Sequence, residues 1–260
     1  MCTLVILHRP GHDWPVVIGA TRDEMQDRPW KPPARHWPDR SQVTAGIDEL
    51  AGGTWLGLND DGVVAGILNR QGSLGPAPDK RSRGELPLEA LDHARAEDAA
   101  EALAHLEPAS YRSFNMVIAD AERAFWLKSA APGNGGGNGG EIPGGVTVQT
   151  IPPGVSMLTS YDLNDMRGAR TRHHLPRFRA APAPDPETGD WQAWQALFAS
   201  RVRDTDAGPE GAMCIVTEYG YGTVSSALIA LPRFDRIGMK PVWLFAAGRP
   251  GETPYEPVTL

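Results

Sequence analysis

Apolar positions in the first 70 residues follow the patterns of short β-strands. Residues 3–7 and 15–20 are rich in valine and isoleucine and flank the turn-like sequence RPGHDW, so they predict a hairpin. Residues 52–59 and 62–69 meet at an Asp-Asp-Gly turn, which is a strong signal for a second hairpin. The proline-rich residues 28–39 lie between the two pairs and predict an irregular surface loop.

The rest of the chain alternates between helical and strand patterns. Alanine and leucine recur at helical spacing over residues 85–106 and predict one or two amphipathic helices. The glycine-rich run at 133–140 predicts a flexible loop, about 133–145, within the domain, because strand patterns resume after it. Further strands are predicted at 114–120, 124–130, 146–150, 155–159, 213–218, 223–231 and 241–248, and further helices at 163–179 and 190–203.

This order of strands and helices predicts an α+β fold. Two antiparallel sheets packed face to face, with helices outside them, accommodate the pattern. A chain of 260 residues is long enough to bury a sizeable core. We therefore interpret residues 1–260 as a single domain.

Composition narrows the class of protein. A net charge of -7 argues against a general binder of nucleic acid or of anionic membranes. Two cysteines make a disulfide framework implausible and favour the reducing cytoplasm. Neither a run of 18 apolar residues nor a signal-peptide pattern is present, so we expect no integral membrane association. The oligomeric state is not predicted.

Cys2 is the first residue that could carry chemistry. A small second residue permits removal of Met1, which would place a thiol and a free α-amine on one carbon. Such an amine, with a pKa of about 7.7–8.0, can act as the base for its own nucleophile. The alternative is that Cys2 is a small apolar residue at the start of a strand.

The first hairpin would bring Arg22 and Asp23 close to Cys2. A neighbouring guanidinium lowers the pKa of a thiol, and a carboxylate could hold the α-ammonium group in position. These residue types therefore suit a nucleophile. The alternative is a charged surface turn.

Four stretches resemble the NRDE family, which includes the transport-and-Golgi-organisation proteins. They are MCTLVILHRP, TRDEMQDRPW, GGTWLGLNDDGVVAGILNRQG and RSRGELPLEAL, with a weaker match at YGTVSSALIAL. Arg22, Asp23 and Glu24 match the motif that names the family, whereas Thr21 stands where the family has asparagine. The resemblance implies a link to haem trafficking and to lipid or acyl-CoA homeostasis.

A more distant resemblance concerns cysteine N-terminal-nucleophile hydrolases, with choloylglycine hydrolases and penicillin V acylases as the nearest groups. Met-Cys-Thr, the later Arg and Asp, and the Asn after a Gly-x-x-Ala-Gly strand carry it. It implies a four-layer αββα sandwich with Cys2 as nucleophile. Arg22 and Asp23 would orient Cys2, and Asn69 would donate to the oxyanion.

The chain departs from those hydrolases in one catalytic stretch. Ser160 stands where they have a second asparagine, and Asn164 could replace it only if the loop folds back. They also use a late arginine, for which the candidates are Arg167, Arg170 and Arg172. The predicted substrate-binding residues are Thr21, Glu24, Trp55, Arg70, Ser160 and Asn164.

Two functions remain open at this point. The first is an amidohydrolase that acts on a small amide or acyl thioester through Cys2, without a metal or cofactor. The alternative is a non-enzymatic protein on the same fold that binds haem, or a lipid or acyl-CoA. Haem would need Cys2, a histidine or a methionine as axial ligand. His173 and His174 are adjacent and therefore project about 100° apart on a helix, which does not suit a metal site.

Overall fold

The computed structural model describes residues 2–73, 75, 77, 79–130 and 145–260, and these residues form two antiparallel sheets. The predicted glycine-rich loop lies almost wholly outside the described residues. Sheet A has the strand order β10-β1-β2-β11-β12-β13. Its strands are β1 (Thr3–His8), β2 (Val16–Met25), β10 (Gly154–Leu158), β11 (Tyr221–Leu231), β12 (Val242–Ala246) and β13 (Glu256–Pro257).

Sheet B has seven strands in sequence order, from β3 to β9. They are β3 (Trp30–Ala34), β4 (Val43–Asp48), β5 (Leu56–Asn59), β6 (Val64–Asn69), β7 (Phe114–Ala119), β8 (Ala124–Ala130) and β9 (Gly145–Thr150). The longer helices are α1 (Leu86–Ala90), α2 (Ala96–Ala104), α3 (Ala169–Ala180) and α4 (Gln192–Phe198). Short 3₁₀ turns occupy Pro38–Arg40, Arg83–Glu85, Pro108–Ser110 and Pro209–Gly211.

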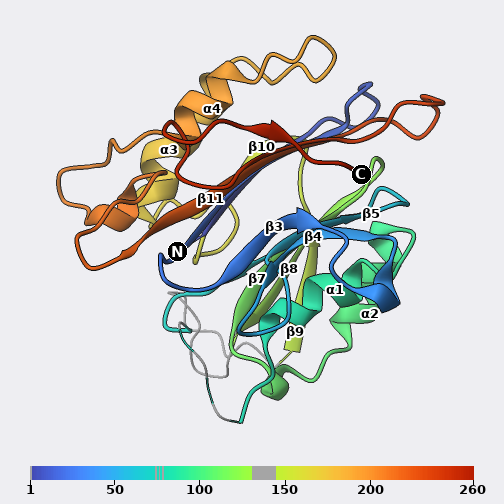
Figure 1. Ribbon diagram of the computed structural model, residues 1–260, viewed down its shortest axis with the longest axis horizontal. Helices are drawn as coiled ribbons and strands as arrows, with labels where there is room; N and C mark the ends of the chain where they lie inside the picture. The colour runs from blue at the N-terminus through green and yellow to red at the C-terminus, as the bar shows by residue number, and fades with distance from the viewer. Residues whose placement is uncertain (1, 74, 76, 78, 131–144) are drawn as a thin grey trace.

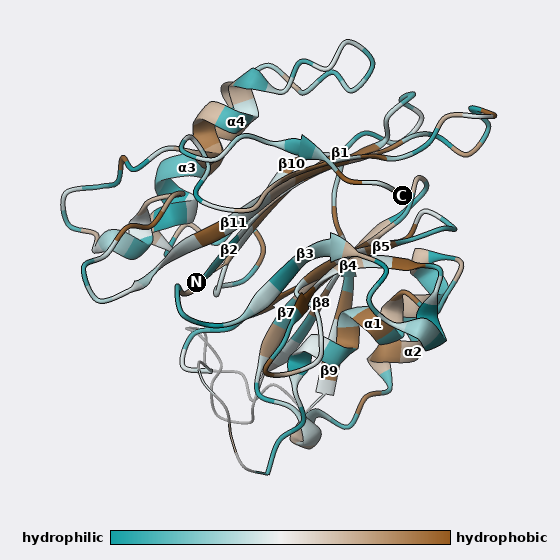
Figure 2. Ribbon diagram, in the orientation of Figure 1, coloured by the Kyte–Doolittle hydropathy of each residue, from teal (hydrophilic) through white to brown (hydrophobic). Residues whose placement is uncertain are grey.

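The two sheets stack face to face, with one pair of helices outside each. Figure 1 shows α3 and α4 over sheet A, and α1 and α2 against sheet B. The predicted four-layer αββα sandwich is therefore confirmed. Figure 2 shows hydrophobic residues along the strands and polar residues on the outer loops.

Three hydrophobic clusters fill the spaces between the layers. Alternation along β1 explains how one strand serves two of them. Leu4 and Ile6 face the core between the sheets, whereas Val5 and Leu7 face the core beneath α3 and α4. A strand buried on both faces reads as a continuous apolar run, as β1 does. The third cluster joins sheet B to α1 and α2.

The predicted hairpin of the first two strands is confirmed. Thr3 of β1 lies opposite Thr21 of β2, and Leu4 lies opposite Leu158 of β10. The start of β1 therefore lies beside the segment after β10 and beside the later half of β2. That half of β2 is long and continues to pair with β11 as far as Met25.

Two local predictions are wrong. The proline-rich residues 28–39 contain strand β3, which lies at the edge of sheet B. Its register with β4 shifts between Lys31 and Ala34, where Pro32 and Pro33 lack the N–H groups of a ladder. Residues 213–218 form only an isolated bridge, between Val216 and Gly222.

Helix α3 starts later than its apolar pattern indicates. The predicted helix began at residue 163, but residues 161–168 turn back before α3 starts at Ala169. Asn164 has a φ of 59°, a left-handed conformation that asparagine tolerates better than most residues. Among the described residues, no helix combines the length and apolarity needed to cross a membrane.

Candidate active site

Cys2 lies directly before β1 and is half-buried against the core between the sheets. Its Sγ accepts a hydrogen bond from the backbone N–H of Asp23, at 3.4 Å. If the β1–β2 register continues by one residue and the β1–β10 register by two, Cys2 lies between Arg22 of β2 and Ser160 after β10. The fold thus brings together Cys2, Arg22 and Ser160, which the sequence analysis had singled out.

Asp23 is held by a buried network. Its Oδ2 accepts a bond from Arg170 Nη1 at 2.9 Å, and its Oδ1 accepts one from Thr223 Oγ1 at 2.6 Å. Arg170 also donates to Thr3 Oγ1 at 2.5 Å and to the Glu210 carbonyl at 2.9 Å. Both members of the ion pair are almost fully buried, so the pair fixes the backbone beside Cys2.

The structure separates the three late arginines. Arg170 is 5% exposed and reaches Asp23 from helix α3. Arg167 is exposed and pairs with Asp165, while Arg172 is exposed and pairs with Asp204. Arg170 is therefore the late arginine that lies at the Cys2 site.

Arg22 is placed by an ion pair and by two indole rings. Its Nη2 donates to Asp48 Oδ2 at 2.7 Å, and its guanidinium carbon lies 4.4 Å from the ring centre of Trp55. Trp30 is farther away, at 5.9 Å. Arg22 Nη1 is buried without a hydrogen-bond partner among the described residues. Trp55, predicted to bind substrate, thus lies against the Arg22 side chain.

Asp48 binds two arginines and neutralises part of their charge. Arg28 Nε donates to the same Asp48 oxygen as Arg22, at 2.6 Å. Burial of Asp48 favours its neutral form, but the bonds and charges of Arg28 and Arg22 outweigh burial and lower its pKa. The cations beside β2 are consequently held in place by a carboxylate of sheet B.

The Cys2 thiol is not preionised. Burial raises its pKa, the charge of Asp23 raises it further, and Arg22 only partly opposes them. The predicted lowering of this pKa by Arg22 is therefore outweighed. Tyr221, which sequence reasoning missed, donates from its hydroxyl to the Asp23 carbonyl at 3.4 Å. Burial, followed by the charges of Cys2 and Asp23, raises the pKa of Tyr221.

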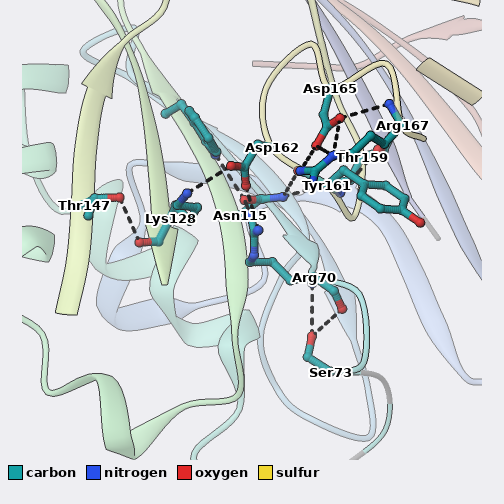
Figure 3. Close-up of polar contacts among 11 residues, drawn as sticks. Arg70, Ser73, Asn115, Lys128, Thr147, Thr159, Tyr161, Asp162, Asp165 and Arg167 are labelled. Carbon is teal, nitrogen blue, oxygen red and sulfur yellow. Dashed lines mark hydrogen bonds and ion pairs between the residues drawn. The ribbon is translucent and has the colours of Figure 1, made fainter. Parts of the chain in front are cut away.

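A second polar cluster bridges the two sheets near the same site (Figure 3). Arg70 Nη1 donates to Asn115 Oδ1 at 2.7 Å, and Arg70 Nη2 donates to Asp162 Oδ1 at 2.6 Å. Lys128 donates to the other Asp162 oxygen at 3.0 Å. Asn115, another residue that the sequence did not single out, is fully buried and donates to the carbonyls of Thr159 and Tyr161.

Ser160 and Asn164 have different surroundings. The backbone carbonyl of Ser160 accepts a bond from Gln71 N–H at 3.0 Å, while its buried Oγ has no partner among the described residues. Asn164 Oδ1 accepts from Met157 N–H at 2.8 Å, and its Nδ2 donates to Ser156 Oγ at 3.1 Å. The loop does fold back, but it brings Asn164 to the edge of β10 that faces away from β1.

Asn69 is the last residue of β6 and is half-buried. By the alternation of β6, it shares the face of Ile67, which packs toward α1 and α2, whereas Leu68 faces the core between the sheets. The side chain of Arg70, the next residue, reaches the bridging cluster. The oxyanion role of Asn69 stays a prediction.

The two remaining predicted binding residues lie along β2. Thr21 is buried between Thr3 and Ser226, and its hydroxyl has no partner among the described residues. The carboxylate of Glu24 is half-exposed and accepts a bond from the N–H of Met25. Within the described ranges, no three histidine, cysteine or acidic side chains are grouped to hold a metal ion.

Two antiparallel sheets packed face to face are also the fold of N-terminal-nucleophile hydrolases. Penicillin V acylase from Agrobacterium tumefaciens superposes with a TM-score of 0.54 at 14% identity, over 95% of this chain and 83% of that one. A mutant conjugated bile acid hydrolase from Clostridium perfringens gives a TM-score of 0.51 at 12% identity, over 100% of this chain and 97% of that one. At these identities the likeness shows the fold alone.

The sequence itself identifies the family. The family described as Transport and Golgi organisation 2 matches residues 1–233, and this chain belongs to it. The homologue from Mus musculus is 35% identical over 115 residues, which are 40% of this chain and 38% of that protein. The human homologue is 32% identical over 117 residues, which are 42% of this chain and 40% of that protein. These matches span about two fifths of the relatives' length.

Proposed function

We propose that this protein is a cysteine N-terminal-nucleophile hydrolase that cleaves a small amide or acyl thioester. One observation carries the proposal: the Cys2 sulfur accepts a hydrogen bond from the Asp23 backbone, and the Asp23 side chain is fixed by Arg170 and Thr223. A nucleophile positioned by a rigid second residue is the arrangement that covalent catalysis requires.

The reaction starts with a protonated thiol, because burial and Asp23 raise the Cys2 pKa. After removal of Met1, the α-amine of Cys2 takes the thiol proton, and Sγ forms a bond to the substrate carbonyl carbon. Negative charge then develops on the carbonyl oxygen. The unpartnered Ser160 hydroxyl is a candidate donor to it, together with Asn69.

The tetrahedral intermediate collapses when its C–N or C–S bond breaks. The leaving amine or thiol takes the proton from the α-ammonium group, and the acyl group remains on Cys2 as a thioester. Water attacks this thioester, and the α-amine takes a proton from the water. The C–S bond to Cys2 then breaks, the ammonium group returns the proton to the Cys2 sulfur, and a carboxylic acid leaves. The buried carboxylate of Asp23, held in its ion pair with Arg170, would stabilise the ammonium form that occurs twice in this cycle.

A panel of acyl amides and acyl thioesters tests the proposal. Protein whose intact mass shows loss of Met1 is compared with protein in which an added N-terminal residue blocks the Cys2 amine. We expect turnover only with the free amine, and a mass increase equal to the acyl group on Cys2. Equal turnover by both forms would remove the α-amine from the mechanism, and no acylation by any substrate would contradict the proposal.

The alternative of haem or acyl-CoA binding without catalysis stays a prediction. Titration with haemin tests its haem branch, with a Soret shift that Cys2→Ala abolishes as the supporting result. No shift, or a shift that the substitution leaves unchanged, would remove Cys2 as an axial ligand.

A further inference from the structure

Arg83 is a half-buried cation that the proposed reaction does not use. It lies in the 3₁₀ turn before α1, and this turn packs directly on the segment before β5 that carries Trp55. Thr54 N–H donates to the Gly84 carbonyl at 2.8 Å. A Cβ on Gly53 would overlap that same carbonyl group. Arg83 is therefore attached to the segment whose tryptophan stacks on Arg22.

The guanidinium group of Arg83 is anchored through one nitrogen. Nη1 donates to Ser73 O at 3.0 Å, to Ser73 Oγ at 2.9 Å and to Ser113 O at 2.9 Å. Ser113 precedes Phe114, which lies opposite Asn69 in the β6–β7 pair. This anchoring orients the group at the end of sheet B that carries Asn69.

The other edge of the guanidinium is not used. Nε and Nη2 of Arg83 make no hydrogen bond to any described residue, and neither is among the buried polar atoms without a partner. The pair Nε and Nη2 forms one of the forks with which arginine binds a carboxylate through two parallel bonds. A rigid side chain thus presents an unused carboxylate-binding edge.

Arg83 is also not neutralised by the protein. The other cations of the site are paired: Arg22 with Asp48, Arg170 with Asp23, and Arg70 with Asp162. Among the described residues, Arg83 forms no ion pair. Burial, followed by the charge of Arg112, lowers its pKa to about 10, and the charge of Cys2 acts in the opposite direction. Arg83 is therefore charged at neutral pH, and the contacts of Thr54 and Trp55 place its turn on the Arg22 side of the Cys2 site.

We infer that Arg83 is a specificity-determining residue that binds a carboxylate of the molecule attacked by Cys2. The inference rests on the proposed function for its chemistry, and it narrows the substrate class to acyl compounds that carry a carboxylate close to the reacting carbonyl. The unpaired charge offsets the cost of removing that carboxylate from water.

Two alkylating reagents of equal size test this without any hydrolysis. In both reactions the Cys2 thiolate displaces iodide, but iodoacetate carries a carboxylate and iodoacetamide carries a neutral amide. The iodoacetate-to-iodoacetamide rate ratio at Cys2, measured by peptide mass spectrometry, is divided by the same ratio for the urea-unfolded chain. A change in the Cys2 pKa affects both reagents alike, so this normalised ratio reports recognition of the carboxylate.

We expect a normalised ratio of roughly five to ten in the wild-type protein, and a ratio near one in Arg83→Gln. Gln keeps a donor for Ser73 and Ser113. Arg83→Lys keeps the charge but lacks the two-donor edge, so its ratio should lie between those of Arg83→Gln and the wild-type protein. The matched control is Arg95→Gln, which removes an exposed arginine paired with Glu122 and keeps the wild-type ratio. Circular dichroism establishes that each variant is folded.

A wild-type ratio near one, or a ratio that Arg83→Gln leaves unchanged, would overturn the inference. A protein that shows the Arg83-dependent ratio but acylates on no substrate would contradict the hydrolase proposal and would support carboxylate binding at Arg83.

Discussion

Both cysteines are linked to one anchored residue, Asp23, but they differ in what surrounds them. The Cys2 sulfur accepts a bond from the Asp23 backbone and faces the core between the sheets. Cys214 precedes Ile215, whose N–H donates to the same Thr223 hydroxyl that binds Asp23. Cys214 is only 1% exposed, and its neighbour Met213 belongs to the core beneath α3 and α4.

This comparison shows that the pKa alone does not distinguish a reactive cysteine from a structural one. Burial is the main factor that raises the pKa of both thiols. The distinction comes from access and from neighbouring groups. Only Cys2 is half-exposed, at a strand start beside buried polar groups that have no partner among the described residues, such as Ser160 Oγ.

The largest expected effect separates the two cysteines directly. Cys2→Ala should reduce labelling by iodoacetamide more than 100-fold and remove all hydrolysis, because the nucleophile is lost. Cys214→Ala should change the labelling of Cys2 and the rate of hydrolysis by less than twofold, since one small buried side chain is replaced by another. Labelling is followed by intact mass. Rapid labelling of Cys214 in the folded protein would contradict the comparison.

Breaking the anchor between the cysteines should have the next largest effect. Asp23→Asn leaves the buried Arg170 charge without its carboxylate, which should lower the free energy of unfolding by about 3 kcal/mol. Urea denaturation measures this change. Glu122→Gln, which breaks an exposed ion pair with Arg95, is the control and should cost less than 1 kcal/mol. Similar losses in the two variants would show that the Asp23 pair is not an anchor.

Acid should lower the free energy of unfolding through His174 of helix α3. Burial, aided by the charges of His173, Arg170 and Arg177, lowers the pKa of His174 to about 4, while a bond to the Val202 carbonyl opposes them. The unfolded chain binds a proton here below pH 6.5 and the folded chain does not. Stability is therefore lost as the pH falls from 6.5 toward 4, by roughly 3 kcal/mol.

Urea unfolding at pH 7 and at pH 4.5 tests this pH dependence. His174→Gln removes the titrating group and should flatten the change between the two pH values. Asp204, which binds His173 and Arg172, also titrates in acid, so His174→Gln is compared with Asp204→Asn. An unchanged pH dependence in His174→Gln would exclude His174 as the cause.

The smallest effect concerns the pH profile of Cys2. Because its pKa is raised above the ordinary 9.0, the rate of alkylation should still increase above pH 9, with only a small fraction of thiolate at neutral pH. The urea-unfolded chain serves as the reference and should level off at lower pH. A plateau below pH 8 would show that the thiol is preionised, contrary to the structure.

The sequence predicts the site best where strand pairing determines it. The apolar runs of β1 and β2 and the turn between them are local signals, and they suffice to place Arg22 and Asp23 beside Cys2. Strand β3 was missed because its prolines indicate a loop, although an edge strand tolerates them. Trp30 of β3 packs against Trp55, with 5.7 Å between the centres of the two rings.

Contacts between distant segments could not be predicted in the same way. Arg170 shares a charged helical pattern with Arg167 and Arg172, and only the packing of α3 on sheet A selects it. Asn115 looks like any polar residue in a strand, yet it joins the two sheets. Asn164 was considered as a replacement for the second catalytic asparagine, but its side chain accepts a hydrogen bond from Met157 and closes the turn after β10.

The contact between Gly53 and Gly84 has a consequence for how this family can diversify. Any side chain at Gly53 would collide with the backbone of the turn that carries Arg83, so the turn cannot be repositioned by gradual changes at that crossing. If Arg83 binds the carboxylate of the ligand, a relative that keeps this crossing and accepts a ligand of different charge would differ at residue 83 itself. The identity of this one residue would then indicate, across many genomes, which ligand charge each protein accepts.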